Sequence, residues 1–144
     1  MKDLIHIQNL RLRCYIGFAE HELREMQDVV ISMWLSTDLR PAGASDNPAD
    51  LLNYRTVNKA VIRAVDGARF NTVEALATAI ARVAITECGV EKIRVAVYKP
   101  GALRFTDSVG VIITRRRRDF LPKKAHRKAA KPAPEAPPER VDEG

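Results

Sequence analysis

A lysine at the end of an apolar segment is the residue best placed for chemistry. Ile93, Val95 and Val97 occupy every second position, and Lys99 continues this alternation directly before Pro100. If the segment is a β-strand, the Lys99 amine leaves the sheet on the apolar face, at the mouth of the core. Desolvation there lowers the pKa of an amine and suits it to general acid–base catalysis. The alternative is a lysine whose stem covers apolar surface while its ammonium group reaches solvent.

Two glutamates and a tyrosine are further candidates. Glu74 follows Asn71 by three residues, a spacing typical of a capping box at a helix start. It could instead anchor a ligand, because a carboxylate accepts two parallel N–H bonds from the guanidine-like edge of a heterocycle. Glu22 follows the first apolar segment and Tyr54 opens a predicted helix. The plain alternatives for these two are a solvated charge and a packing side chain.

The sequence gives no sign of a metal site or a membrane anchor. Its two cysteines and three histidines lack metal-ligand spacing. It contains no phosphate loop, nucleophile elbow, paired-cysteine redox motif or zinc-protease motif. No apolar run approaches the roughly 20 residues of a membrane span, and the N-terminal residues have no signal-peptide core. We therefore expect a reduced, cytoplasmic protein with no metal site and no membrane partner.

The net charge of +6 lies mostly in the C-terminal segment. Residues 115–144 hold ten Lys and Arg against five Asp and Glu, and they begin with four consecutive arginines. Few large apolar side chains follow Leu121, so burial cannot offset the entropy of ordering. We predict one domain over residues 1–118 and a disordered, basic, proline-rich tail over 119–144. The tail is interpreted as solubilising, with binding to RNA, acidic lipid or a protein partner as the alternative.

The elements that would position the candidates follow from apolar periodicity. The patterns predict, in order, strands at 5–17 and 29–36, helices at 53–67 and 71–89, and strands at 93–99 and 109–113. The alternation changes phase near Asn9, which indicates a bulge in the first strand. Residues 38–53 are rich in turn formers and predict a loop. The ββααββ order indicates an α+β fold, with two helices on one face of a four-stranded antiparallel sheet.

Such a sheet has apolar edges and an open face, which both need partners. Unpaired apolar edge strands are an association hazard. Val30 and Trp34 also point away from the face assigned to the helices. These features predict a homo-oligomer whose sheets join edge to edge.

Several short stretches occur together in the order found in one enzyme family. They are Asn9-Leu-Arg-Leu-Arg, Tyr15-Ile-Gly-Phe followed by Glu22, Gln27-Asp-Val-Val-Ile, Ala44-Ser-Asp-Asn, Leu52-Asn-Tyr-Arg-Thr-Val, Arg69-Phe-Asn-Thr-Val-Glu, Lys99-Pro-Gly-Ala and Asp107-Ser-Val-Gly-Val. In these stretches the sequence resembles the dihydroneopterin aldolase family of folate biosynthesis, which includes dihydroneopterin triphosphate 2′-epimerases. The resemblance spans about residues 4–114 and leaves out the tail.

The resemblance implies a tunnelling fold, in which subunits join into a ring and two rings stack into an octamer with active sites between neighbouring subunits. It implies that Lys99 is the general acid/base and that Glu74, with the backbone of Val73, holds the pterin. Glu22 and Tyr54 would contact the substrate, and Tyr54 would come from the neighbouring subunit to assist catalysis. No cofactor, Schiff base or metal is implied.

The implied activity is that of a 7,8-dihydroneopterin aldolase, which cleaves its substrate to 6-hydroxymethyl-7,8-dihydropterin and glycolaldehyde and can also epimerise C2′. The alternative is the triphosphate 2′-epimerase, for which Arg104 or Arg55 would supply a cation to the phosphates. A more remote alternative is a non-catalytic ring whose basic tail binds RNA or another acidic partner. Apart from the tail, we expect no contact with nucleic acid.

Overall fold

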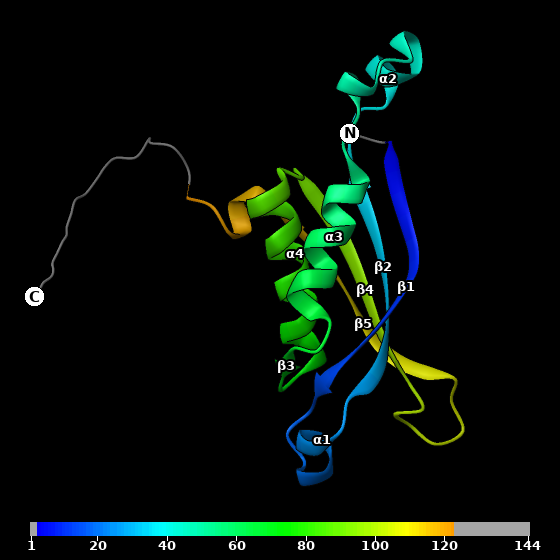
Figure 1. Ribbon diagram of the computed structural model, residues 1–144, viewed down its shortest axis with the longest axis vertical. Helices are drawn as coiled ribbons and strands as arrows, with labels where there is room; N and C mark the ends of the chain where they lie inside the picture. The colour runs from blue at the N-terminus through cyan, green and yellow to red at the C-terminus, as the bar shows by residue number, and fades with distance from the viewer. Residues whose placement is uncertain (1–2, 123–144) are drawn as a thin grey trace, which may run out of the picture.

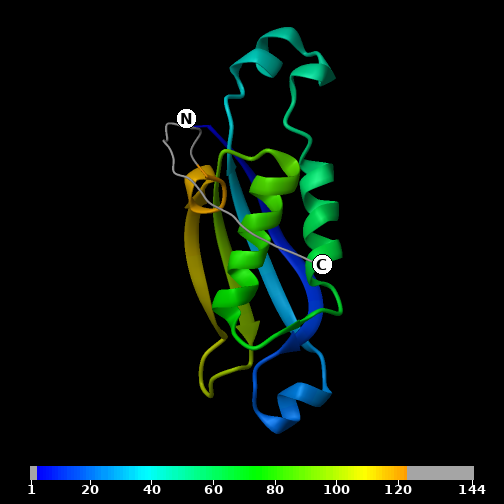
Figure 2. The same cartoon turned by 90° about the vertical axis from the view of Figure 1, so that its left-hand side faces the viewer.

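The computed structural model describes residues 3–122. The long elements are β1 (Leu4–Ile16), β2 (Gln27–Ser36), α3 (Tyr54–Val65), α4 (Val73–Cys88), β4 (Lys92–Pro100) and β5 (Ser108–Arg116). The short ones are α1 (Glu20–Arg24), α2 (Arg40–Ser45), β3 (Arg69–Phe70) and two 3₁₀ turns at Pro48–Asp50 and Arg117–Asp119. Figures 1 and 2 show α3 and α4 side by side on one face of a curved sheet, as expected for an α+β fold.

The sheet has five strands in the order β3-β1-β2-β4-β5, so the prediction of four strands was wrong. Four of them pair antiparallel, and the added β3 pairs parallel with the end of β1, through Tyr15 with Arg69 and Ile16 with Phe70. A two-residue strand has no periodicity that a sequence pattern can detect. Its hydrogen-bonding partners lie more than fifty residues away in the chain.

The bulge predicted in the first strand is confirmed. The pairing of β1 with β2 shifts between Ile7 and Leu10, and Asn9 adopts a left-handed φ of 58°. The Asn9 N–H donates to the Ser32 hydroxyl oxygen over 3.0 Å, so the extra residue keeps a hydrogen-bond partner. The bulge changes which side chains face the helices, and it lets Ile5 and Ile7 before it and Leu10 after it all pack against the core.

Both helices begin at side-chain caps, one of them at a residue other than the predicted one. The Asn53 side chain accepts the N–H groups of Arg55 and Thr56, as predicted. The second helix is capped by Thr72, which accepts the Ala75 N–H over 3.0 Å, and not by Asn71. Glu74 therefore lies at the second helical position, and the predicted capping box with Asn71 is wrong.

The core lies between the two helices and the sheet. Ile93, Val95 and Val97 of β4 are fully buried, and Val57 and Ile80 meet them from the helix layer. The segment predicted as a loop, 38–53, holds α2 and a 3₁₀ turn, because Pro41 and Pro48 each occupy a first turn that does not need their missing N–H. None of the helices in the described residues is long and apolar enough to cross a membrane.

The C-terminal part of the described chain packs onto the domain. Phe120 and Leu121 lie against the core, and the Arg82 guanidinium stacks 4.6 Å from the centre of the Phe120 ring. The ordered body therefore continues past residue 118. The rest of the predicted tail, from residue 123, lies outside the described residues.

Candidate active site

Lys99 lies where the sequence places it, at the penultimate position of β4. Its neighbours on the same face, including Val97, are fully buried, and its own side chain is 14% exposed. Its Nζ lies 3.4 Å from Oε2 of Glu22 and donates a hydrogen bond to it. The amine is therefore held at the rim of the core by a carboxylate, and does not extend freely into solvent.

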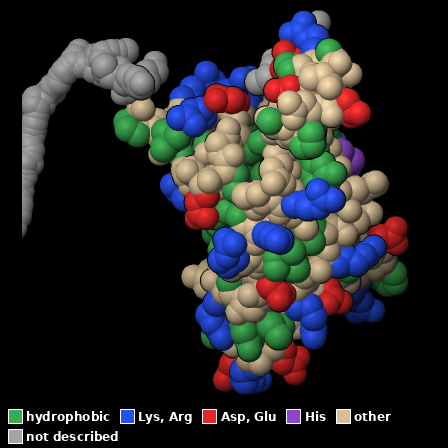
Figure 3. Space-filling model, turned by 45° about the horizontal axis from the view of Figure 1, so that its top comes forward, with side chains coloured by type: hydrophobic (Ala, Val, Ile, Leu, Met, Phe, Trp, Pro, Cys, Tyr) green, Lys and Arg blue, Asp and Glu red, His purple; other side chains and the backbone are tan. Residues whose placement is uncertain are grey.

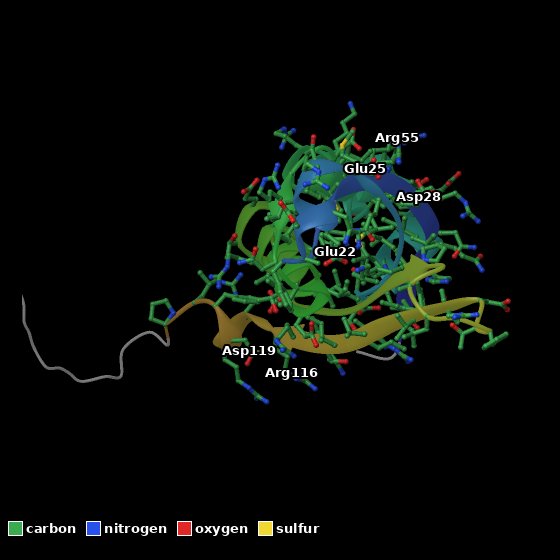
Figure 4. All side chains as sticks on the ribbon, turned by 90° about the horizontal axis from the view of Figure 1, so that it is seen from below. Glu22, Glu25, Asp28, Arg55, Arg116 and Asp119 are labelled. Atoms are coloured by element: carbon green, nitrogen blue, oxygen red, sulfur yellow. The ribbon has the colours of Figure 1, made fainter. Side chains whose placement is uncertain are left out.

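Glu22 is fixed from both sides. Its Oε1 accepts the N–H of Ala19 over 3.1 Å at the start of α1, and its Oε2 faces Lys99. The Ala19 hydrogen bond, aided by the Lys99 charge, lowers the pKa of the Glu22 carboxyl below its usual value. The Glu22 carboxylate therefore faces the Lys99 amine directly. In Figure 4 Glu22 lies toward the middle of this end of the molecule.

The segment that carries Glu22 is braced by residues far away in the chain. The Gly17 N–H donates to the Phe70 carbonyl oxygen over 3.0 Å, and the Gln27 amide donates to the Ile16 carbonyl oxygen over 2.6 Å. The Arg69 guanidinium stacks 4.1 Å from the centre of the Tyr15 ring and donates to the Leu23 carbonyl oxygen over 2.9 Å. The sequence did not identify Gly17, Gln27 and Arg69 as positioning residues. All three occur in the stretches that resemble the family, and this resemblance was the only feature that could have pointed to them.

Gly17 makes room for the Glu22 carboxylate. Its φ of 122° lies in the region that favours glycine, and a Cβ there would overlap the Glu22 carboxyl group. Gly43, by contrast, has open space around the same position.

We expect Gly17→Ala to lower the free energy of unfolding by about 1–3 kcal/mol, because alanine is strained at this φ. It should also displace Glu22 and lower turnover. Thermal unfolding and steady-state rates would measure both effects, with Gly43→Ala as the matched control. If the Gly17→Ala protein had the rate and stability of the Gly43→Ala protein, Gly17 would not be needed to make room for the Glu22 carboxylate.

The start of α4 lies at the same end of the sheet as Lys99. The helix begins at Val73, three residues after β3, and β3 pairs with the last residues of β1. The first N–H groups of a helix have no intrahelical acceptor, and they carry the positive end of the helix dipole. Glu74 is exposed in this first turn. A free carboxylate beside unpaired N–H groups can bind a heterocycle that presents donors next to an acceptor.

Tyr54 lies at the opposite end of the molecule. The end of α3 lies near Arg13, because the Gly67 N–H donates to the Arg13 carbonyl oxygen over 2.8 Å. The twelve residues of α3 place Tyr54 about 18 Å farther along the helix, toward the start of β1. Figure 1 shows this separation between the start of α3 and the end that holds α1. One subunit therefore does not bring Tyr54 and Lys99 together.

The two arginines considered for phosphate binding lie at opposite ends as well. Arg55 follows Tyr54, and its guanidinium stands 5.6 Å from the centre of the Tyr54 ring. Arg104 lies in the turn after β4, 5.3 Å from the centre of the Phe105 ring, which is 98% exposed. Arg104 is therefore at the Lys99 end. Within residues 3–122 no three His, Cys, Asp or Glu side chains are grouped so that they could hold a metal ion.

Comparisons with known proteins identify the family. The family model described as dihydroneopterin aldolase matches residues 5–114. The chain is 37% identical over 111 residues to dihydroneopterin triphosphate 2′-epimerase of Escherichia coli K12, covering 77% of this chain and 92% of that protein. It is 34% identical over 113 residues to the dihydroneopterin aldolase of the same strain, covering 78% of this chain and 93% of that protein.

A solved structure supports the same assignment. The crystal structure of Escherichia coli dihydroneopterin aldolase in complex with neopterin superposes with a TM-score of 0.75 at 34% sequence identity, covering 78% of this chain and 98% of that chain. The family model covers both long helices and nearly all of the sheet. This chain belongs to the dihydroneopterin aldolase family.

Proposed function

We propose that this protein is a 7,8-dihydroneopterin aldolase that cleaves its substrate to 6-hydroxymethyl-7,8-dihydropterin and glycolaldehyde. The observation that carries the proposal is the Lys99–Glu22 pair, held at 3.4 Å at the rim of the core, at the end of the sheet where α4 starts. Neopterin bound to the Escherichia coli relative supports a pterin as the ligand class.

The reaction needs positioning and proton transfer. A base takes the proton of the C2′ hydroxyl, and the C1′–C2′ bond breaks as glycolaldehyde forms. The electron pair moves into the conjugated imine of the dihydropterin ring, so the ring itself is the electron sink. An acid then protonates the resulting enamine at C1′. Lys99 would serve these proton transfers, and Glu22 would fix its amine.

The ring would be held by Glu74 and the backbone at Val73. The carboxylate would accept two parallel N–H bonds from the amidine edge of the pterin, which is a strong, charge-assisted geometry. The positive end of the helix dipole stabilises the carboxylate at this position. Tyr54 of a neighbouring subunit would complete the site in a ring, most simply an octamer of the tunnelling fold.

The triphosphate 2′-epimerase is the second candidate. The same groups would break the C1′–C2′ bond and re-form it on the opposite face of the aldehyde, which inverts C2′. The 37% identity to an epimerase, against 34% to an aldolase, and the position of Arg104 at the Lys99 end support it. Either activity uses the same site.

Product identification separates the candidates. The purified full chain would be incubated with dihydroneopterin and, separately, with its triphosphate, and the products resolved by chromatography. Glycolaldehyde and the hydroxymethyl pterin from dihydroneopterin are the result expected. Conversion of the triphosphate alone to its C2′ epimer would favour the epimerase. No product from either compound would contradict both and favour a non-catalytic ring.

Glu74→Ala should weaken pterin binding strongly, since the ring would lose its charged partner. The maximal rate at saturating substrate should change much less, because Lys99 remains. Pterin titrations and steady-state kinetics would measure this split. Glu87→Ala, which removes an exposed glutamate from the far end of the same helix, is the matched control. Unchanged binding by Glu74→Ala would contradict the anchoring role.

A further inference from the structure

A second feature lies at the end of the sheet away from Lys99. An open pocket of about 430 Å³ is lined by Ser36, Glu91, Lys92, Arg116, Arg117 and Arg118. Figure 3, in which the top of Figure 1 comes forward, shows Lys and Arg side chains gathered at this end. Lys92 and Lys99 are seven residues apart on β4, or roughly 23 Å at the rise of a strand. One small ligand cannot occupy both sites of a subunit.

Two cations face each other directly in this pocket. Lys92 of β4 pairs with Arg116 of β5 in the antiparallel ladder, so both side chains leave the same face of the sheet at adjacent positions. Like charges directly opposite each other destabilise a strand pair. Among residues 3–122, no carboxylate lies within 4.0 Å of the charged groups of these two side chains. An anion between them would relieve the repulsion.

The nearby acids are already engaged. Glu91 lies 3.9 Å from the Arg117 guanidinium, and the Asp119 carboxylate accepts the backbone N–H of Arg116 over 2.7 Å. With four cations against Glu91 and Asp119, the pocket and its margin remain positive. The surplus charge lies on the Lys92 and Arg116 side.

The hydroxyl of a mostly buried residue completes the lining. Ser36 is 7% exposed, it lines the pocket, and none of the hydrogen bonds found among residues 3–122 uses its hydroxyl. By the register of β2 with β4, in which Leu35 pairs with Ile93, Ser36 lies beside Lys92. The pocket thus presents a hydroxyl donor, an ammonium group and guanidinium groups in one row across three strands.

We infer that this pocket binds the phosphate chain of a small polyphosphate. Arginine guanidinium groups pair with phosphate oxygens in a bidentate fork, and a lysine adds a compact charge. The four cations that line the pocket carry more positive charge than a single phosphate ion neutralises, which is why a chain of phosphates matches it better than a monophosphate. Free tripolyphosphate and a nucleoside triphosphate share this chemistry. The inference does not depend on the proposed pterin chemistry.

The test is isothermal titration of the full chain with tripolyphosphate, and separately with GTP, at low and at moderate salt. One binding site per chain is expected, with an affinity that falls as salt rises, because the pocket is open. Lys92→Ala combined with Arg116→Ala should weaken binding at least about tenfold, equal to about 1.4 kcal/mol. Ser36→Ala should weaken it to a smaller extent. Tighter binding of GTP than of tripolyphosphate would show that the nucleoside contributes.

The matched control is Lys59→Ala combined with Arg63→Ala, which removes the same two residue types from the exposed side of α3. Near wild-type affinity is expected for it. The inference is overturned if tripolyphosphate shows no saturable binding, or if the control weakens binding as much as the pocket variant. A short single-stranded RNA provides another check. If several protein chains bind one RNA strand and tripolyphosphate does not displace them, the surface binds nucleic acid and the inference is overturned.

Discussion

Lys99→Ala is expected to lower kcat by on the order of 10²–10⁴-fold, the range for loss of a general acid–base group. Pterin binding should change little, because we propose that Glu74 and the start of α4 hold the ring. Single-turnover rates and pterin titrations measure the two effects separately. The structural basis is the position of the amine at the rim of the core, 14% exposed and 3.4 Å from Glu22.

A second variant guards against a folding defect. Lys99→Met keeps most of the apolar stem and removes only the amine, and the Glu22 carboxylate keeps the Ala19 N–H in both variants. Both variants should therefore lose proton transfer by the Lys99 amine to the same extent, and they should unfold at similar temperatures. Wild-type turnover by Lys99→Met would show that the amine takes no part in proton transfer. Pterin binding lost as fully as in Glu74→Ala would instead assign Lys99 to binding.

The second large effect is expected from mixing two inactive proteins. Tyr54 and Lys99 lie at opposite ends of one subunit, so a site that uses both must draw them from neighbouring chains. Tyr54→Ala and Lys99→Ala should each lose most turnover. In a randomly co-assembled ring, about one site in four would receive an intact Lys99 from one chain and an intact Tyr54 from the next, because each interface joins two different surfaces.

Co-expression of the two variants with different tags would supply the mixed ring, and its turnover per site would be compared with each parent. Recovery to about a quarter of the wild-type rate is expected on the same counting. The matched control mixes Lys99→Ala with Glu22→Gln, since these two residues contact each other within one chain and no intact site can form. Equal rates from both mixtures would place Tyr54 outside a shared site.

Features that depend on residues close together in the chain could be predicted from the sequence. Alternation placed Lys99 on the core side of its strand, and the phase change at Asn9 located the bulge. Asn53 was identified as a cap because its side chain satisfies N–H groups two and three residues ahead. The prediction that α4 starts at Asn71 was wrong, because the next residue, Thr72, also has a side chain that can accept an N–H of the first turn.

Contacts between residues far apart in the chain could not be predicted in this way, because they depend on how the strands pair. Lys99 and Glu22 are 77 residues apart, and their contact depends on the pairing of β2 with β4 and on the brace that β3 provides. The opposition of Lys92 and Arg116 depends in the same way on strand register, because a shift of one residue would turn one of the two side chains to the other face. Periodicity assigns a side chain to a face of its own strand. Register, set by packing across the whole sheet, decides what stands opposite it.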